Sequence, residues 1–188
     1  MPVSSNVPLH VTLRMAKHVW NLRAQRCFVP IRRVLAAVQR PNFRVAQYSV
    51  QGNHLHLLVE ADTHGAFVSG LRSLSIRVAR ALNRVMQRRG RVLGSRTHAR
   101  PLHTPTEVKN ALRYVLLNRT HHVPDATQAD ECSTAPWFRD WAALEEEAPP
   151  LARAGPPLEC VAVAPRTWLL RVGWRQGRAR RRRASPRA

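Results

Sequence analysis

Two histidines stand two residues apart in the run His54-Leu55-His56, inside an apolar stretch that has the character of a β-strand. Because alternate side chains of a strand project from the same face, both imidazoles point the same way, roughly 7 Å apart at a rise of about 3.3 Å per residue. Two imidazoles at that spacing can bind one divalent cation. The same pattern also suits two buried or solvated histidines that bind no metal, so the residues alone leave both interpretations open.

A second pair, Tyr114 and Asn118, is four residues apart in an expected helix, so that both side chains lie on one face. The apolar residues Val108, Leu112 and Val115 form the neighbouring stripe, which would hold the tyrosine ring while its hydroxyl stays accessible. A phenol, with an ordinary pKa of about 10, is a weak nucleophile unless it is deprotonated or attacks a strongly activated phosphate. A half-buried tyrosine with Asn118 as a helix C-terminal cap would give the same pattern.

Three expected strands position the histidines. Residues 8–15 alternate between apolar and polar side chains, and residues 43–51 are rich in β-branched and aromatic side chains. Gly52 and Asn53 form a turn signal between the second strand and a third strand over residues 54–60. Since the link is so short, the second and third strands are expected to form an antiparallel hairpin.

Three helices and one edge strand complete the predicted order. Pro30 is expected at the first position of a first helix, Gly90 after the end of a second, and Thr104 as the N-cap of a third that has a capping box with Glu107. The helices are expected over residues 30–40, from about Phe67 to Arg88, and from Thr104 to about Asn118 or Arg119, and the strand over residues 97–103.

The resulting order, β-α-β-β-α-β-α, predicts an α+β fold. Its first six elements match the ferredoxin-like arrangement, in which two helices cover one face of an antiparallel sheet. The other face of the sheet is then left for the last helix or for a ligand.

Four stretches follow one another on these expected elements: Pro8–Arg14, Phe43–Glu60, His98–Leu102 and Tyr114–Asn118. In this order they resemble the single-tyrosine HUH transposases, and most closely the REP-associated tyrosine transposases. His54-Leu55-His56 is identified as the HUH motif, with Leu55 as its hydrophobic middle residue. The resemblance covers about residues 8–122.

This resemblance implies a DNA-nicking and rejoining enzyme that acts on single-stranded or hairpin, REP-like DNA. Tyr114 would be the nucleophile and would form a 5′-phosphotyrosine intermediate, leaving a 3′-OH that later reseals the strand. His54, His56 and Asn118 would hold Mg²⁺ or Mn²⁺, of which Mn²⁺ suits imidazole better. No nucleotide cofactor is expected, because the phosphotyrosine link stores the bond energy.

A protein that only binds DNA hairpins, or represses through them, would share the fold and the charge and is the alternative to an enzyme. A two-histidine RNA phosphoesterase is excluded, because His10-Val11-Thr12 has no second His-x-Ser/Thr partner in the chain. A metallohydrolase of the HxHxDH type is excluded because Leu58 occupies the aspartate position.

A net charge of +20 over 188 residues indicates a polyanionic partner, with nucleic acid first and an anionic membrane surface second. A GC-rich genome can account for part of the arginine excess. Two groups of arginines are the candidate phosphate-binding residues. One group is a stripe on the second helix and the other lies near the end of the chain: Arg77, Arg80, Arg84 and Arg88, and Arg178, Arg180, Arg181, Arg182 and Arg183.

The chain is expected to divide into a catalytic domain over residues 1–123, an irregular extension over 124–174 and a disordered arginine-rich tail over 175–188. Within the extension, the apolar residues 166–174 are expected to dock onto the body. Three widely separated cysteines fit no metal or disulfide framework, and no apolar run approaches the roughly 20 residues of a membrane span. We therefore expect a cytoplasmic, nucleoid-associated bacterial protein, monomeric or homodimeric, that does not interact with membranes.

Overall fold

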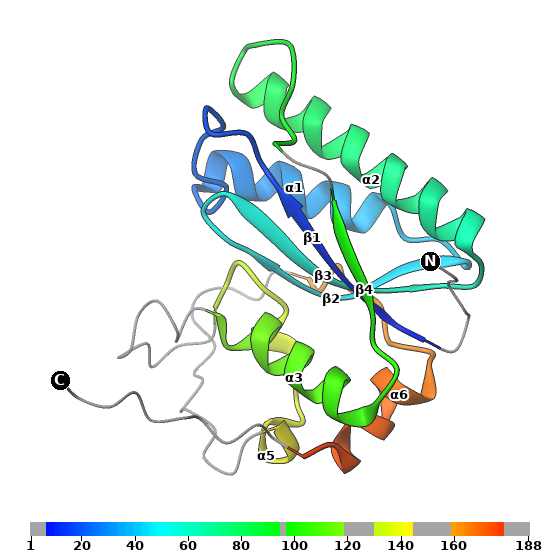
Figure 1. The fold of residues 1–188 in the computed structure, drawn as a ribbon. Coiled ribbons are helices and arrows are strands. Elements are labelled where there is room, and N and C mark those ends of the chain that lie inside the picture. Colours follow the sequence, from blue (N-terminus) through cyan, green and yellow to red (C-terminus); the bar gives the residue numbers. More distant parts are fainter. Residues whose placement is uncertain (1–6, 95–96, 119–129, 145–158, 179–188) are drawn as a thin grey trace, which may run out of the picture.

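The computed structural model of the chain describes residues 7–94, 97–118, 130–144 and 159–178. A four-stranded sheet lies at its centre, with two helices on one face and one helix on the other (Figure 1). The strands and helices of this body follow in the predicted order: β1 Leu9–Arg14, α1 Gln25–Ala37, β2 Phe43–Val50, β3 His54–Ala61, α2 His64–Val85, β4 His98–Pro101 and α3 Pro105–Leu116.

The sheet has the strand order β2-β3-β1-β4, and every neighbouring pair is antiparallel. This is the ferredoxin-like topology that the order of elements predicts, and β4, with Pro101, forms an edge as expected. β2 and β3 form the predicted hairpin, whose register shifts between Val45 and Gln47. The α+β fold class is therefore confirmed.

Side chains alternate between the two faces of the sheet, which separates two hydrophobic cores. Leu55, Leu57 and Val59 of β3 belong to the core under α1 and α2, whereas Leu58 belongs to the core under α3. Because the period of a strand is two, His54, His56 and Glu60 share the α3 face with Leu58. Of the two occupants that the sequence left open for this face, the last helix or a ligand, the structure has the last helix, α3.

Two helix starts differ from the prediction. α1 begins at Gln25, so that Pro30 lies inside the helix rather than at its first position. The ring of Pro30 removes one backbone hydrogen bond near the start of α1, while the turn before it is held by the buried side chains of Cys27 and Phe28. α2 begins at His64, because the side chain of Thr63 caps it by accepting from the backbone N–H of Ala66.

The ends of α2 and α3 also differ. α2 ends at Val85, and the chain turns at Gln87, which has a positive φ of 49°, before it reaches Gly90. α3 has the predicted capping box of Thr104 and Glu107, but it ends at Leu116 with Leu117 as its C-cap. The expectation that one helix continues to Asn118 or Arg119 was wrong.

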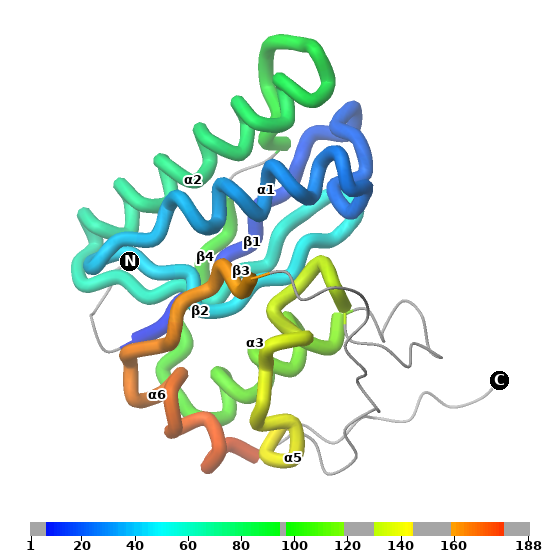
Figure 2. Tube along the Cα trace, turned by 180° about the vertical axis from the view of Figure 1, so that it is seen from behind, coloured from blue at the N-terminus to red at the C-terminus, as the bar shows by residue number. Residues whose placement is uncertain are grey.

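The C-terminal segment, of which residues 130–144 and 159–178 are described, contains short helical turns and packs beside α3 (Figure 2). These turns are η1 Ala135–Trp137, α5 Trp141–Leu144, α6 Trp168–Arg171 and η2 Gly173–Gln176. Leu169, Leu170 and Trp174 are buried in the core under α3, so the docking expected of residues 166–174 is observed. The predicted tail boundary at residue 175 was wrong, because η2 runs to Gln176 and the backbone N–H of Arg178 lies 3.3 Å from Oγ1 of Thr106.

A buried carboxylate joins the C-terminal segment to the sheet. Glu60, on the α3 face of β3, accepts hydrogen bonds from the backbone N–H groups of Arg166 and Thr167 and from the hydroxyl of Thr167 at 2.8–3.1 Å. Its other neighbour is the guanidinium of Arg44, at 3.5 Å. The three cysteines are not joined by disulfides, and no helix among the described residues is long and apolar enough to cross a membrane.

Candidate active site

The α3 face of the sheet brings four ring-bearing side chains together. His10 comes from β1, His54 and His56 from β3, and Tyr114 from α3. Antiparallel pairing of β1 and β3 sets Thr12 opposite His56 and Arg14 opposite His54, which places the polar side chains of both strands on the same face. The structure thus brings Tyr114 to the predicted histidine pair.

His56 is the centre of this cluster. Its ring centroid lies 4.8 Å from that of Tyr114, 4.5 Å from that of His54 and 5.3 Å from that of His10. The ring of Tyr114 is nearly perpendicular to that of His56, with an angle of 84° between the planes. Tyr114 remains 43% exposed, so a ligand can reach this residue while the packed ring is held in place.

The two nitrogens of the buried His56 ring have different surroundings. Nδ1 lies 3.2 Å from the hydroxyl of Thr12 and 3.3 Å from Nε2 of His10. Nε2 is buried and has no hydrogen-bond partner among the described residues. His56 is thus held through one ring nitrogen, while the other is left without a partner in the described parts of the chain.

His54 is oriented by its neighbour in the turn. Its Nδ1 lies 2.7 Å from Oδ1 of Asn53, a geometry in which the Nδ1–H donates and the lone pair sits on Nε2. Asn53 was recognised in the sequence only as part of a turn signal.

Burial keeps the two inner histidines uncharged. Desolvation, with smaller contributions from His54, His10 and Arg14, lowers the pKa of His56 to about 3. Desolvation, followed by the charges of Arg100 and His98, lowers the pKa of His10 to about 4. Both imidazoles are neutral at pH 7, the form in which an imidazole can bind a cation.

The two tyrosines of the chain have opposite environments. Tyr48 points into the core under α1 and α2 and is fully buried, on the other side of the sheet from the histidines. Burial raises the pKa of the Tyr48 phenol well above its ordinary value. Tyr114 is the tyrosine that lies beside the histidine pair.

Asn118 is buried and lies two residues after the end of α3 at Leu116, beyond the C-cap Leu117. Its Nδ2 is buried and has no hydrogen-bond partner among the described residues. The described parts of the chain contain no group of three or more His, Cys, Asp or Glu side chains that could hold a metal ion.

His10 and Thr12 contact His56, although sequence reasoning assigned neither a role and left His10 open. The signal that would have found them is the alternation of the first strand together with its pairing to the third. Both residues stand at even positions, the same face as Arg14, which pairs with His54. Without the register of β1 against β3 the sequence does not show which histidine they meet.

The fold of this chain is similar to that of a REP-associated tyrosine transposase. That protein was solved bound to a REP hairpin; the similarity has a TM-score of 0.55 at 16% sequence identity and covers 70% of this chain and 78% of the other. At this identity the likeness concerns the fold. No family model and no curated protein matches the sequence.

The predicted arginines do not all lie near this site. Arg77, Arg80 and Arg84 belong to α2, which covers the sheet face opposite to α3, and Arg88 follows the end of that helix (Figure 1). Arg178 is placed beside Thr106 near the start of α3, and Arg180, Arg181, Arg182 and Arg183 lie outside the described residues. The cations on the strands of the site are instead Arg14, opposite His54, and Arg100, opposite His10.

Proposed function

We propose that the chain cuts and rejoins single-stranded or hairpin DNA through Tyr114. The observation that carries this proposal is the placement of the exposed Tyr114 against the neutral, strand-borne His10 and His56, on a fold similar to that of a hairpin-bound tyrosine transposase. The net charge of +20 supports a polyanionic substrate.

In the proposed reaction the phenolic oxygen of Tyr114 attacks a backbone phosphorus of the DNA. The phenol loses its proton, the bond from phosphorus to the 3′ oxygen breaks, and that oxygen gains a proton. The products are a 5′-phosphotyrosine link and a free 3′-OH. In the reverse sense a 3′-OH attacks the phosphotyrosine and releases Tyr114, so rejoining requires no other energy source.

His54 and His56, with Asn118 as a third ligand, would hold Mg²⁺ or Mn²⁺. The buried, unpartnered Nε2 of His56 and the neutral state of its ring fit such a ligand. When bound, the cation would neutralise charge that develops on the attacked phosphate. Thr12 holds the ring of His56 from its other nitrogen, and Arg14 and Arg100 would contact phosphates on either side of the cleavage position.

A protein that binds DNA hairpins without cutting them is the second candidate. The early end of α3 favours it, because Asn118, the third proposed metal ligand, lies beyond the last residue of that helix. Incubation of the protein with a hairpin DNA that carries single-stranded flanks, with Mn²⁺ present, separates the two candidates. A covalent protein–DNA adduct supports the enzyme, and tight binding with no adduct supports the second candidate.

A further inference from the structure

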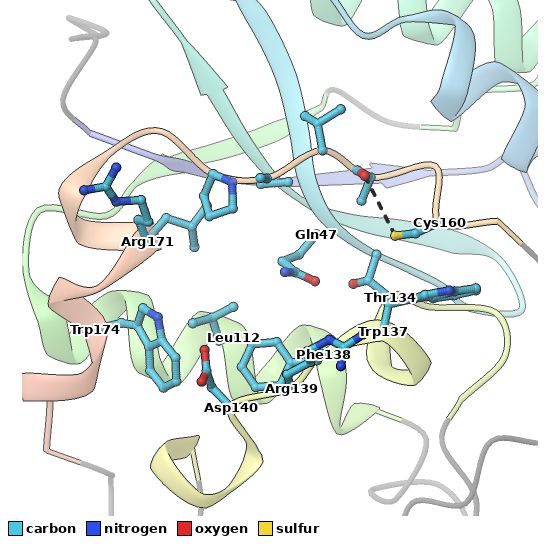
Figure 3. Close-up of a pocket in the computed structure, with 16 residues that line it drawn as sticks. Gln47, Leu112, Thr134, Trp137, Phe138, Arg139, Asp140, Cys160, Arg171 and Trp174 are labelled. Atoms are coloured by element: carbon cyan, nitrogen blue, oxygen red, sulfur yellow. Dashed lines mark hydrogen bonds between the residues drawn. The ribbon is translucent and has the colours of Figure 1, made fainter.

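A cavity of about 320 Å³ lies on the opposite side of α3 from Tyr114. Its walls come from β2, α3 and the two C-terminal stretches 134–140 and 160–174 (Figure 3). Leu112 lines the cavity, and since successive residues of a helix are about 100° apart, its side chain points roughly 200° away from that of Tyr114. The cavity is therefore separate from the candidate active site.

Aromatic side chains form one wall of the cavity. Trp137, Phe138 and Trp174 line it, and the ring of Phe138 lies 5.9 Å from that of Trp174 and 5.1 Å from that of Trp141. Trp174 is almost completely buried, which fixes this wall. Unpaired bases of a nucleic acid stack on aromatic side chains of this kind.

An unsatisfied amide lies inside this cavity. Gln47 follows the register shift of β2, and Figure 3 shows its amide in the middle of the lining side chains. Its Oε1 is buried without a hydrogen-bond partner among the described residues. A buried acceptor of this kind destabilises the folded protein unless a donor reaches it. The missing donor is the observation that points to a ligand.

The other polar groups of the cavity are either engaged or exposed. The hydroxyl of Thr134 lies 3.3 Å from the backbone oxygen of Tyr48, and the carboxylate of Asp140 pairs with Arg175 at 2.9 Å. Arg139 and Arg171 also line the cavity and are exposed. An aromatic wall, one amide and two exposed cations suit a flat ring with hydrogen-bonding edges that is attached to a phosphate.

We propose that this cavity binds one unpaired adenine base of the DNA strand. The Gln47 amide would accept from the exocyclic amino group and donate to a ring nitrogen, which is the bidentate pairing that glutamine makes with adenine. Trp137 and Phe138 would contact the base, and Arg139 and Arg171 would lie near the attached phosphate. The inference takes its ligand class from the proposed function but uses none of the residues around Tyr114.

Titration of the full chain with deoxyadenosine monophosphate, followed by NMR, tests the site directly. The indole N–H signals of Trp137 and Trp174 and the side-chain amide signals of Gln47 should shift saturably, whereas the indole signal of Trp20, on the loop after β1, should not. Thymidine monophosphate should bind about tenfold more weakly, because it cannot complete the same pair of hydrogen bonds. Equal affinity for thymidine monophosphate or for indole would overturn the assignment to adenine.

Gln47→Leu is the decisive variant. It should weaken binding of deoxyadenosine monophosphate about tenfold, the loss expected for one or two hydrogen bonds. Its melting temperature should stay the same or rise, because an unpaired buried acceptor is removed, and a purely structural role would lower it. Gln176→Leu, a matched change at an exposed glutamine outside the cavity, should alter neither quantity.

A second variant keeps the test valid if Gln47→Leu fails to fold. Ala164→Phe fills the cavity from an exposed lining position and should abolish the shifts of the Trp137 and Trp174 signals. Unchanged affinity in Ala164→Phe would overturn the inference. Covalent capture of DNA by Tyr114 with no shifts at the cavity would overturn this inference alone. Binding of the nucleotide without covalent capture would instead contradict the proposed reaction and leave this site standing.

Discussion

The ring of Tyr114 lies edge-on against the ring of His56, with centroids 4.8 Å apart and planes at 84°. This contact joins α3 to β3 across the sheet face, and it leaves the tyrosine 43% exposed while His56 is buried. The packed histidine restricts the tyrosine ring, while much of the residue stays accessible. A proposed nucleophile and a proposed metal ligand therefore share one rigid contact.

Tyr114→Phe should lower covalent capture of DNA by about 10³-fold or more, because only the nucleophilic oxygen is lost. Hairpin binding should stay nearly unchanged, since the ring still packs on His56. The measurement uses 3′-labelled hairpin DNA, which remains attached to the protein on a denaturing gel. Tyr48→Phe is the matched control and should retain capture, because Tyr48 is fully buried on the other side of the sheet. Capture that survives in Tyr114→Phe would move the nucleophile elsewhere.

Replacement of both His54 and His56 by Ala should weaken binding of Mn²⁺ by at least about 100-fold without unfolding the domain. Titration calorimetry of the full chain before and after the change is the direct measurement. His103→Ala, at an exposed position before α3, is the control and should leave the metal affinity unchanged. A double variant that binds Mn²⁺ as tightly as the parent would refute these ligands.

Stability of the metal-free protein should fall as the pH drops below about 6.5, the ordinary pKa of histidine. The folded-state pKa is lowered to about 4 for His10 and to about 3 for His56. Between these values and 6.5 the unfolded chain therefore binds more protons than the folded chain. Urea unfolding in the presence of a chelator, at pH values above and below 6.5, measures the effect.

His10→Gln should flatten this pH dependence, because it removes one of the two groups responsible. Carboxylates also titrate at low pH, so the comparison with the parent chain matters more than the absolute slope. His64→Gln, at the exposed start of α2, should keep the slope of the parent. An equal slope in His10→Gln and the parent would contradict the burial argument.

Glu60→Gln should lower the free energy of unfolding by about 2 kcal/mol, since the buried carboxylate serves three donors of Arg166 and Thr167 and one guanidinium. Limited proteolysis should become faster near residue 166, because Glu60 holds that segment on the sheet. Glu131→Gln, at an exposed position, should have almost no effect. If Glu60→Gln changed the free energy of unfolding as little as the control does, the apolar contacts of Trp174 would be sufficient to hold this segment on the sheet.

Removal of residues 179–188 should reduce affinity for all DNA sequences by a similar factor. It deletes Arg180, Arg181, Arg182, Arg183 and Arg187 but leaves Arg178 and the packed Gly177 in place. The slope of log K against log salt should become shallower by up to about 0.7 for each lost single-strand phosphate contact. Sequence preference should survive, because phosphate contacts position and base contacts specify. If the tail instead reads the DNA sequence, its removal would reduce discrimination between DNA sequences and leave the slope of log K against log salt nearly unchanged.

Local signals in the sequence were sufficient to predict most of the strands of the sheet and the start of α3. The alternation of β1, the short link at Gly52-Asn53 and the capping box of Thr104 each act within a few residues, and all three appear in the structure. Helix ends were less certain because they depend on competing local caps. Thr63 starts α2 earlier than its apolar periodicity indicated, and Gln87 turns the chain before Gly90.

By itself the sequence determined the ferredoxin-like order, the shared face of His54 and His56, and a buried stripe beside Tyr114 on the last helix, because these follow from periodicity along one chain segment. Only the tertiary structure decided what each of these faces meets. Strand pairing placed Thr12 opposite His56, α3 ended before Asn118, and Glu60 bound a segment far along the chain. The packing of α2 placed its arginines on the face away from Tyr114. Contacts between distant segments arise from register and packing, which no local pattern encodes.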